Sequence, residues 1–226
     1  MTSHQPRTAL IAGASGLVGA ELLEALLADP IVVRVHSLVR RPSGRSGEAL
    51  AEQVVDFANL SAAALALKVD EAYCCLGTTM QAAGSREAFR QVDLDAVVAF
   101  GRLAADAGAR SFAVVSSVGA GASARSFYLR TKGEMERDLA ALGLPSLVIL
   151  RPSLLLGERR ETRWGERAGE LGLRLASPLL KGSLARYRPV HARAVARAMI
   201  AAVRRAVPGV RVVESDEIPR LAAPPP

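Results

Sequence analysis

The sequence contains little cysteine, few aromatic residues and few lysines, and each shortage excludes a class of protein. Its 226 residues include only two cysteines, which are adjacent at Cys74 and Cys75. Adjacent cysteines provide neither a disulfide framework nor the spaced ligands of a zinc site. We therefore expect no metal site, a reducing compartment and a cytoplasmic location.

Aromatic residues make up only 4% of the chain, which argues against a base-stacking surface for single-stranded nucleic acid. The chain has 29 lysines and arginines and a net charge of +7, but only Lys68, Lys132 and Lys181 are lysines, which leaves 26 arginines. An excess of positive charge attracts anions in general, nucleotides included, and does not select among them. Because no nucleic-acid-binding motif accompanies the charge, we expect no nucleic-acid partner.

Long apolar runs are missing as well. No stretch approaches the ~18 uninterrupted apolar residues of a transmembrane helix, so we expect no membrane span. The run Thr8–Ala20 follows Arg7 and imitates a signal peptide, but it contains three glycines and continues into a charged amphipathic stretch. With 50% apolar and 23% charged residues, the chain is not disordered in bulk, and its length indicates a single domain over residues 1–226.

Short apolar runs alternate with stretches of helical periodicity along the chain. The predicted strands cover Thr8–Ala12, Ile31–Val39, Val54–Phe57, Ala72–Leu76, Ser111–Ser117, Ser146–Leu150 and Val210–Val213. The predicted helices cover Leu17–Leu27, Arg86–Ala107, Tyr128–Leu142 and Val190–Arg205. This alternation predicts an α/β fold, a Rossmann-type doubly wound parallel sheet. Residues 157–187 break the rhythm and are interpreted as a small C-terminal cap on the substrate side, and residues 215–226 as a flexible tail.

Three glycines, Gly13, Gly16 and Gly19, lie where the first predicted strand passes into the first predicted helix. Such a turn lets the backbone approach a pyrophosphate closely, and the first N–H groups of the helix then hold the phosphates. Glycines also cluster in ordinary turns, but their position in the first strand–helix turn favours dinucleotide binding. The predicted contacts in this turn are Gly13, Ser15, Gly16, Leu17, Val18 and Gly19.

The residues after the second strand indicate which dinucleotide binds. An NAD site usually has an acidic residue there, whereas an arginine accommodates a 2′-phosphate. This chain has Arg40 and Arg41, which predicts NADP(H) and makes NAD(H) the less favoured cofactor; a solvated charged loop is the alternative. Further cofactor contacts are predicted after the third strand, facing the adenine, and after the fourth, beside the adenosine ribose. They are Asp56 and Phe57, then Leu76, Gly77 and Thr78.

Tyr128 and Lys132 are four residues apart and therefore share one face of a helix. In a reductase, such a tyrosine protonates the developing alkoxide, while the lysine lowers the pKa of the tyrosine and holds the ribose. Ser117, at the end of the fifth strand, can donate a hydrogen bond to the carbonyl oxygen. With three tyrosines and three lysines in the chain, this spacing is expected by accident on the order of 0.04 times. The alternative is a surface helical pair.

Together, the glycine turn, Ser117, Tyr128 and Lys132 resemble the short-chain dehydrogenase/reductase superfamily. Within it, the chain is similar to the Tat-interacting-protein-like oxidoreductases of the atypical branch, from about Thr8 to Arg205. The segments that carry this likeness are Cys74–Thr79, Val92-Asp93, Ser116–Ala120, Tyr128–Glu134 and Arg151-Pro152. The resemblance implies an NADP-binding fold in which Ser117, Tyr128 and Lys132 are catalytic. It also implies cofactor contacts at Ser116, Tyr128 and Lys132, and at a nicotinamide-side loop of Arg151, Pro152 and Ser153.

One departure from that family concerns the proton relay. Many short-chain reductases have an asparagine on the helix after the fourth strand, whereas Phe89–Gly101 contains only Gln91, Asp93 and Asp95 as comparable residues. The leading prediction is an NADP-dependent oxidoreductase that acts on a small carbonyl or alcohol, with Tyr128 as acid and base. The alternative is an NADP(H)-binding regulatory or partner-binding protein with vestigial catalysis. The sequence does not name the substrate, and it is compatible with a monomer or a homodimer.

Overall fold

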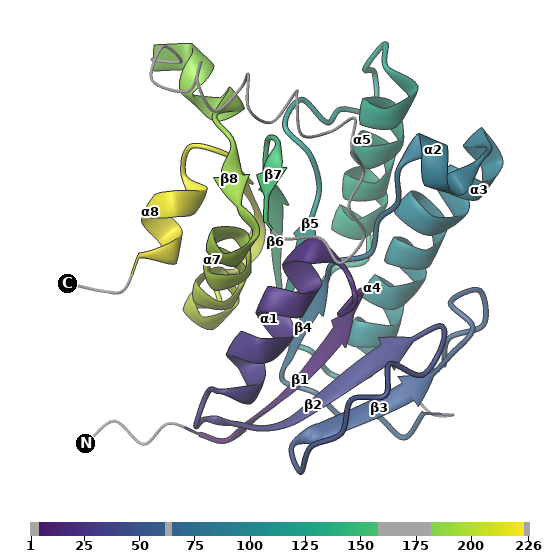
Figure 1. The fold of residues 1–226 in the computed structure, drawn as a ribbon, viewed down its shortest axis with the longest axis vertical. Coiled ribbons are helices and arrows are strands. Elements are labelled where there is room, and N and C mark those ends of the chain that lie inside the picture. Colours follow the sequence, from purple (N-terminus) through teal and green to yellow (C-terminus); the bar gives the residue numbers. More distant parts are fainter. Residues whose placement is uncertain (1–4, 62–64, 158–181, 224–226) are drawn as a thin grey trace.

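A parallel sheet of seven strands forms the centre of the protein (Figure 1). The computed structural model describes residues 5–61, 65–157 and 182–223. The strands are β1 (Arg7–Ala12), β2 (Val32–Val39), β3 (Leu50–Val54), β4 (Glu71–Cys74), β5 (Ser111–Val115), β6 (Ser146–Arg151) and β9 (Gly209–Glu214). Their order is β3-β2-β1-β4-β5-β6-β9, and every neighbouring pair is parallel. The order reverses between β1 and β4, and ligands of such sheets bind outside the carboxyl ends of the strands at this point.

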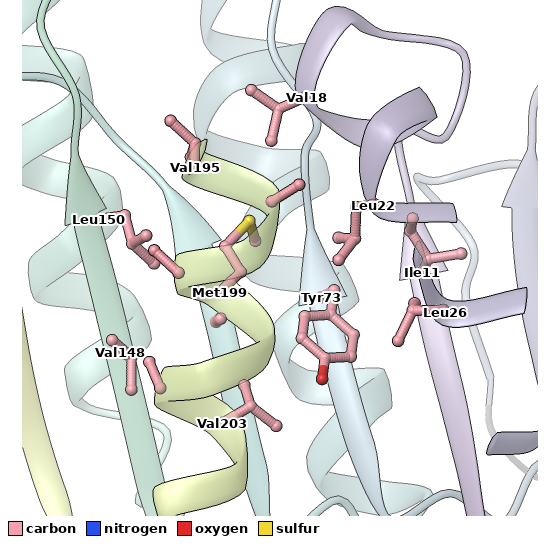
Figure 2. Packing of buried hydrophobic residues seen from close by; sticks show 14 of the residues in the cluster. Ile11, Val18, Leu22, Leu26, Tyr73, Val148, Leu150, Val195, Met199 and Val203 are labelled. Carbon is pink, nitrogen blue, oxygen red and sulfur yellow. The ribbon is translucent and has the colours of Figure 1, made fainter. Parts of the chain in front are cut away.

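Helices cover both faces of this sheet. On one face lie α1 (Leu17–Leu27), α7 (Ala192–Arg205) and α8 (Ile218–Ala222), and on the other lie α4 (Ala96–Asp106) and α5 (Phe127–Ala140). Figure 2 shows the first layer, where Leu22 of α1 and Met199 of α7 pack over Tyr73 of β4. The next residue of β4, Cys74, belongs to the opposite hydrophobic cluster, because consecutive strand side chains point to opposite faces. The predicted doubly wound fold is thus confirmed.

The single helix expected over Arg86–Ala107 is interrupted. A short helix α2 (Met80–Ala83) is followed by α3 (Arg86–Arg90), a π-helical turn η1 (Gln91–Asp95) and then α4. The wider π turn keeps apolar residues buried before and after it, so the apolar periodicity of the sequence does not reveal it. Single π turns are uncommon in helices and often lie at functional sites.

The third strand was expected at Val54–Phe57, and this expectation is wrong. The strand β3 ends at Val54, because Asp56 forms a turn by accepting a hydrogen bond from the Ala58 N–H at 3.0 Å. As an edge strand, β3 is half-buried and carries no continuous apolar run. Phe57, beyond the strand, is buried in the cluster beneath α4.

The expected cap over residues 157–187 lies mostly outside the described residues. Its described flanks include a two-stranded parallel pair, β7 (Leu155–Leu156) with β8 (Val190–His191), and a 3₁₀ helix, η3 (Gly182–Tyr187). At the start of this region, a Cβ added to Gly157 would lie 2.8 Å from Leu17 Cδ1. This flank of the cap is therefore in contact with the first residue of α1, next to the glycine turn.

The chain end differs from the flexible tail expected over residues 215–226. Ile218 and Leu221 of α8 are buried in the cluster that contains α7, and they give this short helix an apolar face to bury. The hydroxyl of Ser215 also accepts a hydrogen bond from the Ser153 N–H at 3.0 Å. Packing of α8 against this cluster therefore keeps the chain ordered as far as the end of α8. Within the described ranges, no helix is both long and apolar enough to cross a membrane.

Candidate functional site

The candidate site lies at the carboxyl edge of the sheet. The strand register places Ala12 beside Cys74, Cys74 beside Val114, and Val114 beside Ile149, so β1, β4, β5 and β6 end close together. The segments that follow these four strands contain the glycine turn, Gly77–Thr78, Ser116–Ser117 and Arg151–Ser153. Four of the segments predicted from sequence are therefore gathered along one edge.

Two of the three glycines in the turn are required by backbone packing. Gly13 has a φ of +85°, and a Cβ there would lie 2.5 Å from the carbonyl carbon of Cys75. A Cβ on Gly19 would lie only 2.0 Å from the carbonyl oxygen of Gly13. At Gly16 the nearest atom to an added Cβ would be the carbonyl oxygen of Gly13 at 3.3 Å, which is a tight contact but less severe than the other two. The geometry matches a dinucleotide turn, in which the three glycines allow a tight turn, close approach of the backbone to the pyrophosphate and close packing of the helix on the strand.

The start of α1 is free of side-chain caps. Gly16 is the N-cap residue, no described side chain bonds to it, and the first turn holds no acidic residue. The first N–H groups of a helix have no partner within the helix, so they are available to an anion. Ser15 is exposed and Leu17 half-buried, but Val18 packs in the core. Val18 can therefore contact a ligand only through its backbone.

Two exposed arginines, Arg40 and Arg41, follow β2 at the same edge, because Leu38 of β2 pairs with Ala12 of β1. The nearby Arg45 forms an ion pair with Glu24 of α1 at 2.6 Å. None of the ion pairs among the described residues involves Arg40 or Arg41. Both guanidinium groups are therefore available to an anionic ligand.

The two residues predicted to face an adenine have different surroundings. Asp56 is exposed, and its carboxylate accepts hydrogen bonds from the Ala58 N–H and the Asn59 side-chain amide. These bonds lower the pKa of Asp56. Phe57 is only 9% exposed and packs in the core, so its ring supports the turn from below.

Lys132 lies deep in the site. Its side chain is 5% exposed, and its Nζ is 2.7 Å from Oδ1 of Asp93 in η1. Burial alone would lower the pKa of Lys132, but the Asp93 carboxylate and the neighbouring Tyr128 oxygen outweigh burial, and the pKa is raised. The other carboxylate oxygen of Asp93 accepts a hydrogen bond from the Thr78 N–H at 2.8 Å. Lys132 is thus a charged group joined to the segment after β4.

Tyr128 is half-buried at the start of α5. Its ring centroid lies 5.7 Å from that of Phe89, which is fully buried and fixes the position of the tyrosine ring. The structure thus brings Tyr128 and Lys132 together. Ser117 is half-buried in the loop after β5, where its carbonyl accepts the Ala120 N–H. Among the described residues, its side chain has no hydrogen bond to either of the other two predicted catalytic residues.

A second buried carboxylate, Glu136, lies one helical turn after Lys132 on α5. It accepts a hydrogen bond from the hydroxyl of Ser116 and one at 3.0 Å from Nε of Arg151. Arg151 also pairs with Glu214 of β9 at 3.1 Å. The ends of β5, β6 and β9 are therefore fixed to the helix that carries Tyr128.

The predicted nicotinamide-side loop is held by its neighbours. The carbonyl of Pro152 accepts the Val118 N–H at 3.0 Å. Ser153 donates two hydrogen bonds, from its N–H to the hydroxyl of Ser215 and from its own hydroxyl to the carbonyl of Arg188. Sequence reasoning placed this loop at the site and named Asp93 among the residues that stand where related enzymes have an asparagine, but it predicted neither the contact of Asp93 with Lys132 nor Glu136. The sequence signal that could have identified both residues is an acidic residue at a position where an amphipathic helix is otherwise buried.

An open hollow of about 650 Å³ lies elsewhere, at the amino ends of the strands. Its lining includes Thr8 at the start of β1, Arg34 and His36 of β2, and Lys68 before β4. Doubly wound sheets bind their ligands at the opposite, carboxyl edge. The hollow is therefore separate from the candidate site.

A doubly wound parallel sheet with a glycine turn at its switch point defines a dinucleotide-binding protein of the Rossmann class. Comparison with protein families agrees, because the model described as "NAD(P)H-binding" matches residues 13–206. The chain belongs to this NAD(P)H-binding family, in the atypical branch of the short-chain dehydrogenase/reductase superfamily. The family resemblance inferred from the sequence is thereby confirmed.

Curated relatives cover most of the chain. Protein FMP52, mitochondrial, of Eremothecium gossypii is 35% identical over 214 residues, which is 93% of this chain and 95% of the relative. Protein HTATIP2 of Rattus norvegicus is 37% identical over 166 residues, 72% of this chain and 68% of the relative. Several fungal relatives are named mitochondrial, which overturns the cytoplasmic location expected from the cysteine content. Reduced cysteines do not distinguish one reducing compartment from another, which is why that inference failed.

Solved structures share the fold at low sequence identity. MoeE5 in complex with UDP-glucose and NAD is 18% identical, with a TM-score of 0.68 over 93% of this chain and 79% of that one. The ADP-L-glycero-D-manno-heptose-6-epimerase of Helicobacter pylori is also 18% identical, with a TM-score of 0.69 over 96% of this chain and 82% of that one. These similarities establish the Rossmann-like fold.

Proposed function

We propose that this protein is an NADP(H)-dependent oxidoreductase that transfers hydride between the cofactor and a small carbonyl or alcohol. The observation that carries the proposal is the position of Tyr128 and Lys132. Both lie on α5, and Lys132 reaches the segment after β4, next to the switch point where the glycine turn lies. A phenol and a buried ammonium group beside a dinucleotide turn suit acid–base chemistry coupled to hydride transfer.

The turn and the charges around it fit a dinucleotide. The uncapped start of α1, with a glycine as its N-cap residue, suits a diphosphate. The exposed Arg40 and Arg41 suit the 2′-phosphate that distinguishes NADP(H) from NAD(H). When bound, the cofactor supplies or accepts the hydride.

The chain's own residues supply the proton and the orientation. In the direction of reduction, the Tyr128 hydroxyl donates its proton to the carbonyl oxygen as negative charge develops there. The Ser117 hydroxyl donates a hydrogen bond to the same oxygen, and this bond strengthens in the transition state. Lys132 keeps a positive charge beside Tyr128 and would donate hydrogen bonds to the ribose hydroxyls of the cofactor.

The cofactor preference is tested by thermal stabilisation, because a ligand that binds only the folded state raises the melting temperature. We expect NADPH to raise it more than NADH at equal concentration. The double variant Arg40→Ala/Arg41→Ala should lose that difference. The matched control Arg102→Ala, an exposed arginine of α4, should keep it. Equal stabilisation of the unmodified protein by both cofactors would remove the role assigned to the two arginines.

Catalysis is tested with a panel of carbonyl compounds, monitored by cofactor absorbance. The variant Tyr128→Phe should keep NADPH binding and lose turnover by at least about a hundredfold, the usual contribution of a general acid. If the unmodified protein binds NADPH and Tyr128→Phe changes no rate, Tyr128 is not the acid. The NADP(H)-binding regulatory protein would then be the better description.

A further inference from the structure

Asp93 is a buried carboxylate with partners on two different elements. Its Oδ1 lies 2.7 Å from Nζ of Lys132 on α5, and its Oδ2 accepts the Thr78 N–H at 2.8 Å. The side chain of Asp93 is 1% exposed and that of Lys132 is 5% exposed. One carboxylate therefore joins the helix that carries the predicted catalytic pair to the segment after β4.

The π turn presents this carboxylate to the interior. Asp93 is the central residue of η1, between α3 and α4, and it is fully buried, whereas Asp95 at the end of the same turn is exposed. An acidic residue at a buried helix position is costly unless it is paired. Its pairing with Lys132 and Thr78 meets that requirement and gives the π turn a specific role.

Gly77 lies directly against this ion pair. A Cβ at Gly77 would be 3.4 Å from Oδ1 of Asp93 and 3.8 Å from Nζ of Lys132. Because Gly77 has no side chain, space is left next to the ammonium group at the edge of the sheet where the glycine turn lies. A cofactor ribose could approach Lys132 through that space.

We propose that Asp93 is a positioning residue that holds Lys132 as a permanent cation against the Gly77–Thr78 segment, so that Lys132 binds the cofactor ribose and does not carry protons. This inference rests on the proposed function. A lysine at this position could hold the ribose or carry protons, and the inference assigns Lys132 the first role alone. It also accounts for the absence of an asparagine between Phe89 and Gly101.

The groups around Lys132 all favour its charged form. Asp93 faces it from η1, Tyr128 from α5 and Cys74 from β4, and none of them is a cation. Burial opposes the charge, but these neighbours outweigh burial and raise the pKa of Lys132. Deprotonation would also leave Asp93 as an unpaired buried charge, which is strongly unfavourable.

The proton balance of the reaction then has a simple form. In reduction, the O–H bond of Tyr128 breaks and a new O–H bond forms on the substrate oxygen. The resulting phenolate takes a proton from solvent, to which the half-buried Tyr128 is partly exposed. Lys132 keeps all three of its protons through the cycle. An asparagine at position 93 has a single acceptor oxygen, so it could keep only one of the two hydrogen bonds from Lys132 and Thr78, and it would not supply the negative charge.

The experiment measures the dissociation constant of NADPH between about pH 7 and pH 9 for the full chain and two matched variants, Asp93→Asn and Asp95→Asn. Without the carboxylate, burial lowers the pKa of a lysine by up to several units, so Lys132 should lose its charge within this range. We expect about tenfold weaker binding at the upper pH for Asp93→Asn. The unmodified protein and Asp95→Asn should show almost no change.

A double-mutant cycle tests whether Asp93 acts through Lys132. Once Lys132→Met has removed the ammonium group, adding Asp93→Asn should cost no further NADPH affinity. The double variant should also melt at a higher temperature than Lys132→Met alone, which leaves a buried carboxylate unpaired. If Asp93→Asn does not fold by itself, the comparison of Lys132→Met with the double variant carries the test.

The outcomes separate this inference from the proposed function. If the unmodified protein binds neither NADPH nor NADH, the proposed function fails and the inference fails with it. If it binds NADPH and Asp93→Asn has the same affinity at every pH, only the inference is overturned. A loss of affinity on adding Asp93→Asn to Lys132→Met would also overturn it, because Asp93 would then act independently of the lysine.

Discussion

The guanidinium group of Arg151 binds the carboxylate of Glu136 with both Nε and Nη2, and so joins the end of β6 to α5. The same carboxylate accepts the hydroxyl of Ser116 at the end of β5. Glu136 lies four residues after Lys132 and eight after Tyr128, on one stripe of the helix. A single acidic residue thus fixes two strand ends against the face of α5 that carries the predicted catalytic pair.

Replacement of Glu136 should therefore destabilise the protein. We expect Glu136→Ala to lower the free energy of unfolding by roughly 2–3 kcal/mol. This loss is smaller than for most broken buried ion pairs, because Arg151 keeps its other partner, Glu214. Urea denaturation measures the change. Glu48→Ala, at an exposed loop position, is the control and should stay within about 0.5 kcal/mol of the unmodified protein. A similar effect of both substitutions would show that the Glu136 contacts contribute little.

The three glycines of the turn should respond differently to alanine. At Gly13 the positive φ and at Gly19 the 2.0 Å approach to the Gly13 oxygen make a Cβ untenable, so both variants should lose more than about 1 kcal/mol of stability. Gly16→Ala should fold with a smaller loss but bind NADPH at least about tenfold more weakly, because its methyl group, 3.3 Å from the Gly13 oxygen, disturbs the turn proposed to hold the diphosphate. Gly121→Ala, with open space around its Cβ, is the control.

Melting temperature and NADPH titration of these variants separate the two effects. A Gly16→Ala variant that binds NADPH as tightly as the Gly121→Ala control would place the diphosphate elsewhere. Equal stability of Gly13→Ala and the control would contradict the backbone contacts described for the turn.

The thiol of Cys74 should be unreactive in the native protein. Cys74 is fully buried, and burial raises its pKa to about 12. Because the thiolate is the reactive form, a thiol reagent at about pH 8 should not label Cys74 until the protein unfolds. Mass spectrometry of labelled peptides, with and without denaturant, measures this difference. Labelling of Cys74 in the native protein at a rate near that of the denatured chain would show that β4 opens readily.

Much of the fold could be predicted from local sequence patterns. The helix α1 has the predicted bounds Leu17–Leu27, because an apolar stripe begins directly after the glycine turn and ends before Asp29-Pro30. The edge strand β3 and the terminal helix α8 were missed because their stability comes from tertiary contacts. In β3 the backbone pairs with β2, and in α8 Ile218 is covered by α7.

The site was predictable only where its residues are close in sequence or follow a strand. Tyr128 and Lys132 are neighbours on a helix by spacing alone. The pairing of Lys132 with Asp93 depends on a π turn that leaves the apolar periodicity intact, so no sequence pattern revealed it. The contact of Ser116 with Glu136 depends in the same way on how α5 packs against β5.

The ion pair of Lys132 and Asp93 should also set how stability changes at alkaline pH. Because the pKa of Lys132 is raised in the folded protein above its ordinary value of 10.5, the unfolded chain releases this proton first as the pH rises. The stabilisation by the pair is therefore fully present below about pH 10.5 and is lost as the pH rises through the folded pKa. The double variant Asp93→Asn/Lys132→Met lacks both titrating groups and is the reference.

Urea denaturation at several pH values should then give a constant difference in unfolding free energy between the unmodified protein and this double variant from about pH 7 to pH 10, followed by a decline above that range. Titrating groups that lie away from the pair are the same in both proteins and cancel in the difference. A difference that already changes between about pH 7 and pH 9 would mean that Lys132 exchanges its proton near neutral pH. Lys132 could then carry protons to Tyr128, and Asp93 would not hold it as a permanent cation.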